Sequence, residues 1–253
     1  MNTILLYFSI KYKGDWDQIY AAINKKEKVD EQLMGELLSK QENKYITILD
    51  DNYPVKLKTI YKPPFVLFYK GEISLLSNKN KTLAIIGSRK NTLYGKHVTE
   101  NLTKDLVKEG IVVVSGLARG IDAIAHQTAL NNNGKTIAVL GNGINVNYPL
   151  ENSLLKHELS DKGLIVSEYP DFIEAKKEHF PKRNRIIAGL SDAVLVTEAN
   201  CKSGTMITVS RALEMGKDIF CVPNIIGCNS GCNMLIKDGA KLVECAKDIL
   251  LDI

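Results

Sequence analysis

The stretch Thr82–Gly116, TLAIIGSRKNTLYGKHVTENLTKDLVKEGIVVVSG, decides the fold. It opens and closes with short β-branched apolar runs that do not alternate with polar residues, a pattern typical of strands buried on both faces. Between these runs, a helical pattern extends from Tyr94 to Gly110, and the glycine supplies a left-handed stop for the helix. A strand, a helix and a second strand in this order predict a right-handed crossover between parallel strands.

The same alternation continues along the chain. Further strand-like runs are KYITILDD (44–51), FVLFY (65–69), KTIAVLG (135–141), LIVSEY (164–169), DAVLVTEA (192–199) and DIFCVPN (218–224). Helical patterns separate the later runs, at GIDAIAHQTALNNNG (120–134), NSLLKHELSDKG (152–163), RNRIIAGLS (183–191), SGTMITVSRALEMG (203–216) and GCNMLIKDG (231–239). We therefore expect an α/β fold with a doubly wound, mostly parallel sheet.

The N-terminal region has a different pattern. Asp15 precedes the helical segment WDQIYAAI (16–23), and Asp30 precedes a second one, EQLMGELLSK (31–40); both aspartates are suited to cap a helix. The first segment repeats apolar residues at the helical period, at Trp16, Ile19, Tyr20 and Ile23. Helices this short bury little surface alone. We predict a short helical region over residues 1–43 that leans on an α/β domain over residues 44–253.

The composition excludes several classes of protein. The 253 residues are 45% hydrophobic and 25% charged, with 18 Gly and 7 Pro, which excludes collagen-like and low-complexity chains. The net charge of +4 does not by itself demand a nucleic-acid partner. No stretch approaches the roughly 18 apolar residues of a membrane span, and the N-terminal MNTILLYFSIKYK lacks the features of a signal peptide.

The cysteines indicate the compartment and argue against a metal site. There are five, an odd number without an export signal, which favours reduced thiols in the cytoplasm. Cys228 and Cys232 are the one close pair, and neither a second pair nor a neighbouring histidine accompanies them. We therefore expect no metal ion.

Ligands of doubly wound sheets bind beyond the carboxyl ends of the strands. Three glycine-containing loops lie there, each ahead of a helix: Gly87-Ser88-Arg89, Ser115-Gly116-Leu117-Ala118-Arg119-Gly120-Ile121-Asp122 and Ser203-Gly204-Thr205. Glycine admits a ligand close to the backbone, and a helix N-terminus offers free N–H groups and partial positive charge. One such loop would be an ordinary tight turn, but three at one edge, with Arg89 beside the first, predict a phosphate site.

The densest basic segment of the chain lies between two predicted strands. It runs from Ala175 to Arg185, and its charged and aromatic members are Lys176, Lys177, Phe180, Lys182, Arg183 and Arg185, with Asn184 among them. Cations suit a nucleic-acid backbone, and an interleaved aromatic ring offers a flat face to a base, as single-stranded DNA requires. We expect this segment to be a loop over the same sheet edge. The alternatives are a merely solvated charged loop, or packing and salt-bridging roles for Phe180 and Arg185.

No catalytic residue and no cofactor are predicted. The dinucleotide fingerprint fails at Gly141–Val146, where valine replaces the third glycine, and neither a P-loop nor a GxSxG motif is present. His126 is expected to be structural and Asp122 to brace its loop. Glu198, at a strand end, is the one carboxylate predicted to face a ligand.

At this point the motifs match a known family. GSRKNTLYG, VVVSGLARGIDAIAH, TIAVLGNGINVNYP, SEYP, FPKRNRIIAGLS, EANCKSGTMIT and SGCNMLIKDGA, in this order, resemble the DNA-processing protein A family (DprA, also called Smf) over about residues 50–251. The resemblance implies an extended Rossmann-like domain that binds single-stranded DNA without strong sequence preference. It also implies a cytoplasmic recombination mediator, usually a homodimer, that protects incoming DNA and helps load the RecA recombinase in natural transformation.

The resemblance also assigns residues. It implies a phosphate contact for Arg89, a base contact for Phe180, a groove lined by Lys177, Arg183 and Arg185, and free N–H groups and hydroxyls from the loops. The complete predicted DNA site is Gly87, Ser88, Arg89, Ser115, Gly116, Leu117, Ala118, Gly120, Lys177, Phe180, Lys182, Arg183, Asn184, Arg185, Ser203, Gly204 and Thr205. Candidates for the dimer surface are Met234, Leu235, Ile236 and Leu242, for which ordinary core packing is the alternative.

The chain differs from the family in two respects, and two alternative functions remain possible on the same fold. The chain stops at Ile253, so we expect no C-terminal winged helix, and the N-terminal helices look shortened. One rival is a nucleotide-processing enzyme of the phosphoribohydrolase type, which needs carboxylates after its Gly-Thr loop, whereas Met206, Ile207 and Thr208 stand here. The other rival is a sensor that binds a small nucleotide at the same edge.

Overall fold

The computed structural model describes residues 1–253 and contains a nine-stranded sheet. The strands, in sheet order, are β1 (Lys44–Thr47), β2 (Val66–Gly71), β6 (Leu164–Ser167), β5 (Thr136–Leu140), β4 (Val112–Ser115), β3 (Thr82–Gly87), β7 (Ala193–Glu198), β8 (Ile219–Cys221) and β9 (Lys241–Leu242). Strands β3 to β9 are parallel, while β1 and β2 are antiparallel to their neighbours. The predicted mostly parallel α/β sheet is confirmed.

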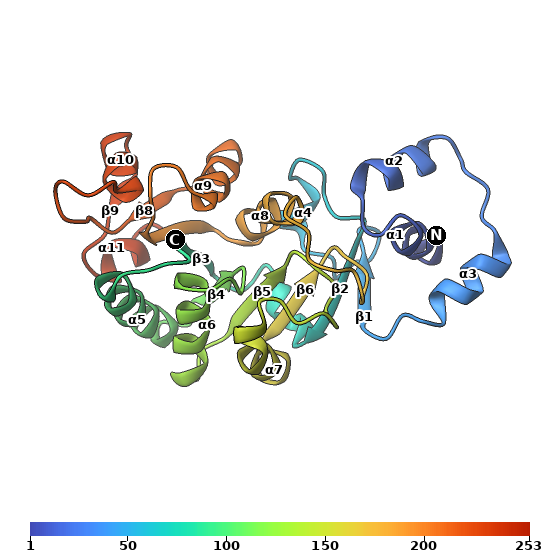
Figure 1. Cartoon of the computed structure of the whole chain (residues 1–253), viewed down its shortest axis with the longest axis horizontal. Helices are drawn as coiled ribbons and strands as arrows, with labels where there is room; N and C mark the ends of the chain where they lie inside the picture. The colour runs from blue at the N-terminus through green and yellow to red at the C-terminus, as the bar shows by residue number, and fades with distance from the viewer.

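Helices cover both faces of the sheet (Figure 1). One face carries α5 (Leu93–Lys108), α6 (Ile121–Asn131), α7 (Ser153–Lys162) and the short α11 (Lys247–Leu250); the other carries α4 (Val55–Lys58), α8 (His179–Leu190), α9 (Gly204–Glu214) and α10 (Gly231–Lys237). Within β3, Leu83 and Ile85 pack in the cluster with α5 and α6, whereas Ala84 and Ile86 pack in the cluster with α8 and α9. Because both faces are buried, the strand sequence is apolar throughout rather than alternating.

The winding of the sheet creates a switch point beside β3. The chain passes from β3 through β4 and β5 to β6 in one direction, and then returns to place β7 on the opposite side of β3. The connections that follow β3 and β7 lead to helices on opposite faces, α5 and α9. Loops that diverge in this way leave a crevice at the carboxyl ends of the two strands, where ligands of such folds bind.

The N-terminal region consists of α1 (Asn2–Lys11), α2 (Trp16–Asn24) and α3 (Glu31–Leu38). Both predicted caps are confirmed, because Asp15 accepts a hydrogen bond from the Gln18 N–H and Asp30 from the Leu33 N–H. Helix α1 contributes apolar side chains to the cluster that includes β2 and α7, so the region leans on the sheet. None of the helices combines the length and the apolar character needed to cross a bilayer.

The periodic pattern of α2 predicts more burial than the structure shows. Ile19 is buried, but Tyr20 is 51% exposed and Ile23 is 37% exposed. Trp16 instead stacks on the ring of Tyr20 and on the ring of Phe65, with centroids about 5 Å apart. The difference arises because a three-helix region offers each helix only a narrow partner surface.

Candidate nucleic-acid interface

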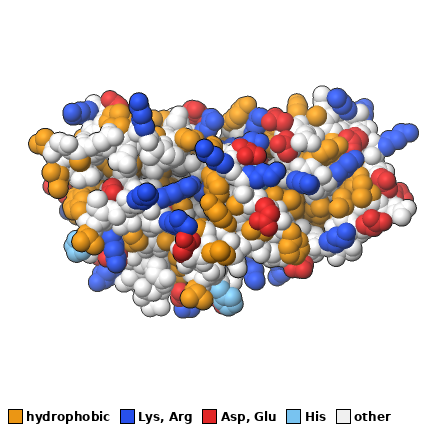
Figure 2. Space-filling model, in the orientation of Figure 1, with side chains coloured by type: hydrophobic (Ala, Val, Ile, Leu, Met, Phe, Trp, Pro, Cys, Tyr) orange, Lys and Arg blue, Asp and Glu red, His pale blue; other side chains and the backbone are white.

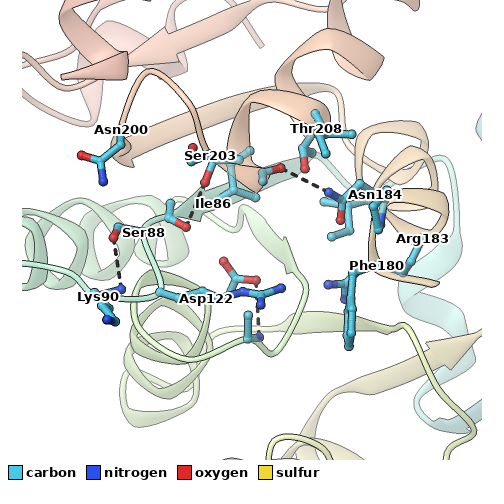
Figure 3. Close-up of a pocket in the computed structure, with 18 of the residues that line it drawn as sticks. Ile86, Ser88, Lys90, Asp122, Phe180, Arg183, Asn184, Asn200, Ser203 and Thr208 are labelled. Atoms are coloured by element: carbon cyan, nitrogen blue, oxygen red, sulfur yellow. Dashed lines mark hydrogen bonds between the residues drawn. The ribbon is translucent and has the colours of Figure 1, made fainter. Parts of the chain in front are cut away.

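A cavity of about 470 Å³ lies at the switch point between β3 and β7. Figure 3 shows its walls, which come from the loop after β3, the start of α6, the first turns of α8, and the loop after β7 with the start of α9. The predicted site residues that line this cavity are Gly87, Ser88, Arg89, Ala118, Lys177, Phe180, Arg183, Asn184, Ser203, Gly204 and Thr205. Segments more than a hundred residues apart in the sequence therefore meet in one hollow.

Gly120 allows the first two loops to meet. Its φ is +75°, and a Cβ there would lie 2.2 Å from the carbonyl oxygen of Ser88. That oxygen accepts a hydrogen bond of 3.1 Å from the Ile121 N–H. Since an L side chain would be strained at this angle and would also clash, glycine is required for the close approach.

The cavity is lined by unpaired positive charge. Arg89, Lys90 and Lys177 line it and form no ion pair with a carboxylate. Figure 2 shows a row of Lys and Arg side chains across the middle of the face, in the band between the two helical layers. Exposed cations without partners are available to an anionic ligand.

The start of α9 adds neutral donors. Ser203 is the N-cap residue of this 11-residue helix, but its side chain makes no capping hydrogen bond. The Ser203 hydroxyl is buried and has no hydrogen-bond partner, although the residue lines the cavity. Because a buried hydroxyl without a partner is costly, this group is suited to a ligand oxygen, as are the free N–H groups of the first helical turn.

Phe180 presents an aromatic ring at the edge of the cavity (Figure 3). The ring is half-buried, and the guanidinium carbon of Arg89 lies 5.4 Å from its centroid. A Cβ on Gly141 would lie 2.9 Å from the ring, so this glycine makes room for it. A cation without an ion-pair partner and a flat apolar face therefore lie side by side.

The basic segment is not the loop that the sequence predicts ahead of the helical pattern at 183–191, because the helix starts four residues earlier. Helix α8 begins at His179, so Phe180 to Arg185 lie in its first turns. Pro181 is compatible with this start because the N–H groups of the first turn have no partner within the helix. The helical geometry sends the basic side chains in different directions.

Arg183 and Arg185 therefore do not act as free cations. Arg183 is buried and donates hydrogen bonds to the carbonyl oxygens of Gly116 and Val139, and burial lowers the pKa of its guanidinium to about 10. Arg185 is also buried; it pairs with the carboxylate of Glu168 and faces away from the cavity. Burial opposes the charge on Arg185, but the Glu168 carboxylate outweighs it and raises the pKa. Both arginines fix α8 to the sheet.

Lys182 and Asn184 also point in different directions, and only one of them lines the cavity. Lys182 lies outside the cavity, 3.5 Å from the carboxylate of Asp15. Asn184 lines the cavity, and its amide lies 3.5 Å from the carbonyl oxygen of Gly204. Of this pair, the asparagine faces the predicted ligand.

Two predicted hydroxyl donors are already engaged. Ser115 is buried and donates a 2.6 Å hydrogen bond to the carbonyl oxygen of Ile85. Thr205 donates a 3.0 Å hydrogen bond to the carbonyl oxygen of Gly87. These hydroxyls connect the loops to β3, so the prediction that they serve a ligand is corrected.

The loop after β4 offers fewer N–H groups than predicted. The N–H groups of Gly116 and Ala118 donate to the carboxylate of Asp122, at 3.2 and 3.4 Å. The prediction that Asp122 braces its loop is therefore confirmed, and burial raises the pKa of this carboxyl. The side chain of Leu117 is buried in the core.

Glu198 and His126 also have structural roles. The Glu198 carboxylate accepts hydrogen bonds from the Thr92 N–H and hydroxyl, at 3.0 and 2.7 Å, at the start of α5. It therefore does not face a ligand as predicted. His126 is fully buried with its Nδ1 2.7 Å from the hydroxyl of Thr136, and burial lowers its pKa to about 3, which keeps the ring neutral.

The predicted dimer residues divide between core and surface. Leu235, on α10, is buried in the core cluster on that face of the sheet, and Ile236 packs against the same cluster. Leu242, on β9, is 46% exposed, and Met234 is half-buried. Leu235 is thus unavailable to a second copy of the chain.

Sequence reasoning missed several residues of the cavity. Lys90, Asn200, Ile207 and Thr208 all line it. Lys90 follows Arg89 directly and Asn200 follows β7, so their position after a strand was a usable signal. Ile207 and Thr208 lie on the first turns of α9, and only the packing of α9 beside α8 brings them to the cavity.

Comparisons with known proteins identify the family to which the chain is similar. The family model described as DNA recombination-mediator protein A matches residues 44–253. The chain is 46% identical over 219 residues to DNA processing protein DprA from Streptococcus pneumoniae, covering 85% of this chain and 77% of that protein.

Two solved structures agree with the match. The X-ray structure of DprA from S. pneumoniae superposes with a TM-score of 0.85 at 37% identity and covers 100% of this chain and 98% of that one. DNA processing protein A from Helicobacter pylori, whose structure describes a single-stranded DNA binding mode, gives a TM-score of 0.75 at 32% identity and covers 83% of this chain and 95% of that one. The chain therefore belongs to the DNA recombination-mediator protein A family.

Proposed function

We propose that this protein binds single-stranded DNA in the cavity between β3 and β7 and acts as a mediator of DNA recombination. The observation that carries the proposal is the juxtaposition of unpaired cations with the partly exposed ring of Phe180, 5.4 Å from the guanidinium of Arg89. Membership of the family and the described DNA-binding mode of the H. pylori relative support it.

Phosphates and bases have separate places in this proposal. Arg89, Lys90 and Lys177 contact the sugar-phosphate backbone, and the start of α9 donates from its N–H groups and from the Ser203 hydroxyl. A base stacks on Phe180, which requires that the base be unpaired. Backbone contacts and stacking do not depend on base identity, so we expect little sequence preference.

The function proposed is not enzymatic. Among the residues that line the cavity, Asp122 is the one carboxylate, and it is buried and engaged by two backbone N–H groups. Cleavage of a glycosidic bond needs a carboxylate near the anomeric carbon. We therefore expect no base release from nucleoside monophosphates.

The wider role proposed is that of a cytoplasmic protein in natural transformation or DNA repair. The protein would protect incoming single strands and help to load RecA on them. Residues 44–253 would carry DNA binding, with residues 1–43 as an accessory region. A homodimer would use the exposed part of the surface formed by α10 and β9, including Leu242 on β9.

Fluorescence anisotropy with labelled oligo-dT tests the proposal, beside the matching duplex and with thymidine monophosphate as competitor. We expect saturable binding of oligo-dT, weaker binding of the duplex, and little competition by the mononucleotide. Equal affinity for duplex, or a mononucleotide that binds more tightly than the oligonucleotide, would contradict the proposal. The second of these results would favour a nucleotide sensor.

A further inference from the structure

A second cavity adjoins the first across Phe180. It has a volume of about 210 Å³, and the two cavities share five lining residues, Arg89, Lys90, Ala118, Phe180 and Arg183. Its other walls come from the loops after β4 and β5. Phe180 and Arg89 therefore stand between two hollows rather than at the end of one.

The second cavity has its own aromatic ring. Tyr148 lines it and is 45% exposed. The Tyr148 ring lies 5.4 Å from that of Phe180, at an interplanar angle of 33°. The two rings thus form a bent, partly exposed apolar platform, of the kind on which unpaired bases stack.

The backbone just before Tyr148 is held in place. The buried ammonium of Lys156 donates to the carbonyl oxygen of Val146 and to the side chain of Asn147, at 2.7 and 3.2 Å. The amide of Asn142 donates to the same Val146 oxygen at 2.9 Å. A ring on a fixed segment loses little freedom when a ligand binds, which favours a recognition role.

The charge of the second cavity suits a polyanion. Arg89, Lys90, Arg119 and Arg183 line it, and no aspartate or glutamate does. Arg119 is exposed and pairs with Glu151 outside the cavity. Arg183 is engaged by backbone carbonyls and Arg119 by Glu151, so Arg89 and Lys90, which line both cavities, are the cations left for the phosphates of a strand that passes Phe180.

We propose that the second cavity is a further nucleotide subsite, in which an unpaired base stacks on Tyr148 while a neighbouring base of the same strand occupies the first cavity. This inference rests on the proposed binding of single-stranded DNA. The second subsite adds Tyr148, which is distant in the sequence from the basic segment, to the DNA site. It also predicts that the DNA passes across Arg89, between the β3–α5 loop and the start of α8.

Photocrosslinking tests contact directly. Oligo-dT that carries 5-iododeoxyuridine, a base analogue that couples to stacked aromatic rings on irradiation, is bound to the whole chain, and adducts are mapped by peptide mass spectrometry. We expect adducts on both Phe180 and Tyr148. Adducts on Phe180 without any on Tyr148 would overturn the second subsite but leave the proposed function standing. Absence of binding would overturn the proposed function itself.

Affinity measurements complete the test. We expect Tyr148→Ala to weaken oligo-dT binding about 5- to 150-fold, the range for loss of one stacked base, and Tyr148→Phe to retain most of the affinity. Tyr45→Ala, at an exposed ring on the distant edge strand β1, is the matched control and should leave binding unchanged. An affinity for Tyr148→Ala equal to that of the control would refute the subsite.

Discussion

Replacement of Arg89 by alanine should change how strongly binding depends on salt. Each phosphate contact to a single strand contributes about −0.7 to the slope of log affinity against log salt, because counterions are released. The first cavity is lined by three cations without ion pairs, Arg89, Lys90 and Lys177. Three contacts give a slope of about −2.1, and removal of Arg89 should reduce it to about −1.4.

The difference is large enough to measure by fluorescence anisotropy with oligo-dT. Between about 50 and 200 mM salt, these slopes correspond to an affinity loss of about 18-fold for the unaltered protein and about 7-fold for Arg89→Ala. Arg211→Ala is the matched control, because Arg211 pairs with Glu214 and lies outside the cavity. Its slope should equal that of the unaltered protein.

Two results would refute this reasoning. If Arg89→Ala kept the full slope, Arg89 would not contact a phosphate, whatever its effect on affinity. If the unaltered protein itself showed no salt dependence, binding would not follow the DNA backbone, and the proposed chemistry of the cavity would be wrong.

Three further predictions address the ring, the buried ion pair and the buried histidine. Phe180→Ala should weaken oligo-dT binding about 5- to 150-fold without changing the salt slope, whereas Phe172→Ala, at a 58% exposed ring outside the cavity, should change neither in the same titration. Arg185→Met should lower the free energy of unfolding, measured in urea, by about 3–5 kcal/mol, because it leaves the Glu168 carboxylate buried and unpaired. Replacing both Arg185 and Glu168 by methionine should restore most of the lost stability. An unchanged urea midpoint for Arg185→Met would contradict this role. Because the pKa of His126 falls to about 3 on folding, the unfolded chain binds a proton below about pH 6.5 that the folded chain does not. Stability should therefore fall with acid between those values, and His126→Gln should flatten the dependence by up to about 1.4 kcal/mol per pH unit in urea titrations, with an unaltered slope as the contrary result.

The sequence predicted the strands well because burial on both faces leaves a strong local signal. Runs such as the one that became β3 are apolar at successive positions, from Leu83 to Ile86, and glycines mark the turns that follow. The caps Asp15 and Asp30 could be predicted as well, since a capping bond spans only three residues. The two-residue strand β9 was missed because its side chains are exposed and carry no apolar pattern.

The direction of the polar side chains could not be predicted. Arg89 and Arg183 are equally basic in the sequence, yet one lies exposed over Phe180 and the other is buried against backbone carbonyls. Glu198 stands at a strand end, as a ligand-facing carboxylate would, but it accepts hydrogen bonds at the start of α5 instead. In each case the partners lie more than forty residues away in the sequence.

The sequence by itself determined the mostly parallel α/β class, the loops at the carboxyl edge of the sheet and the family resemblance, because hydrophobic patterning and turn residues act over a few neighbouring positions. Only the tertiary structure decided which cations remain free, which hydroxyls and N–H groups are already engaged, and that Tyr148 lies beside Phe180. Those outcomes depend on hydrogen bonds and packing between distant segments, for which the chain carries no local signal.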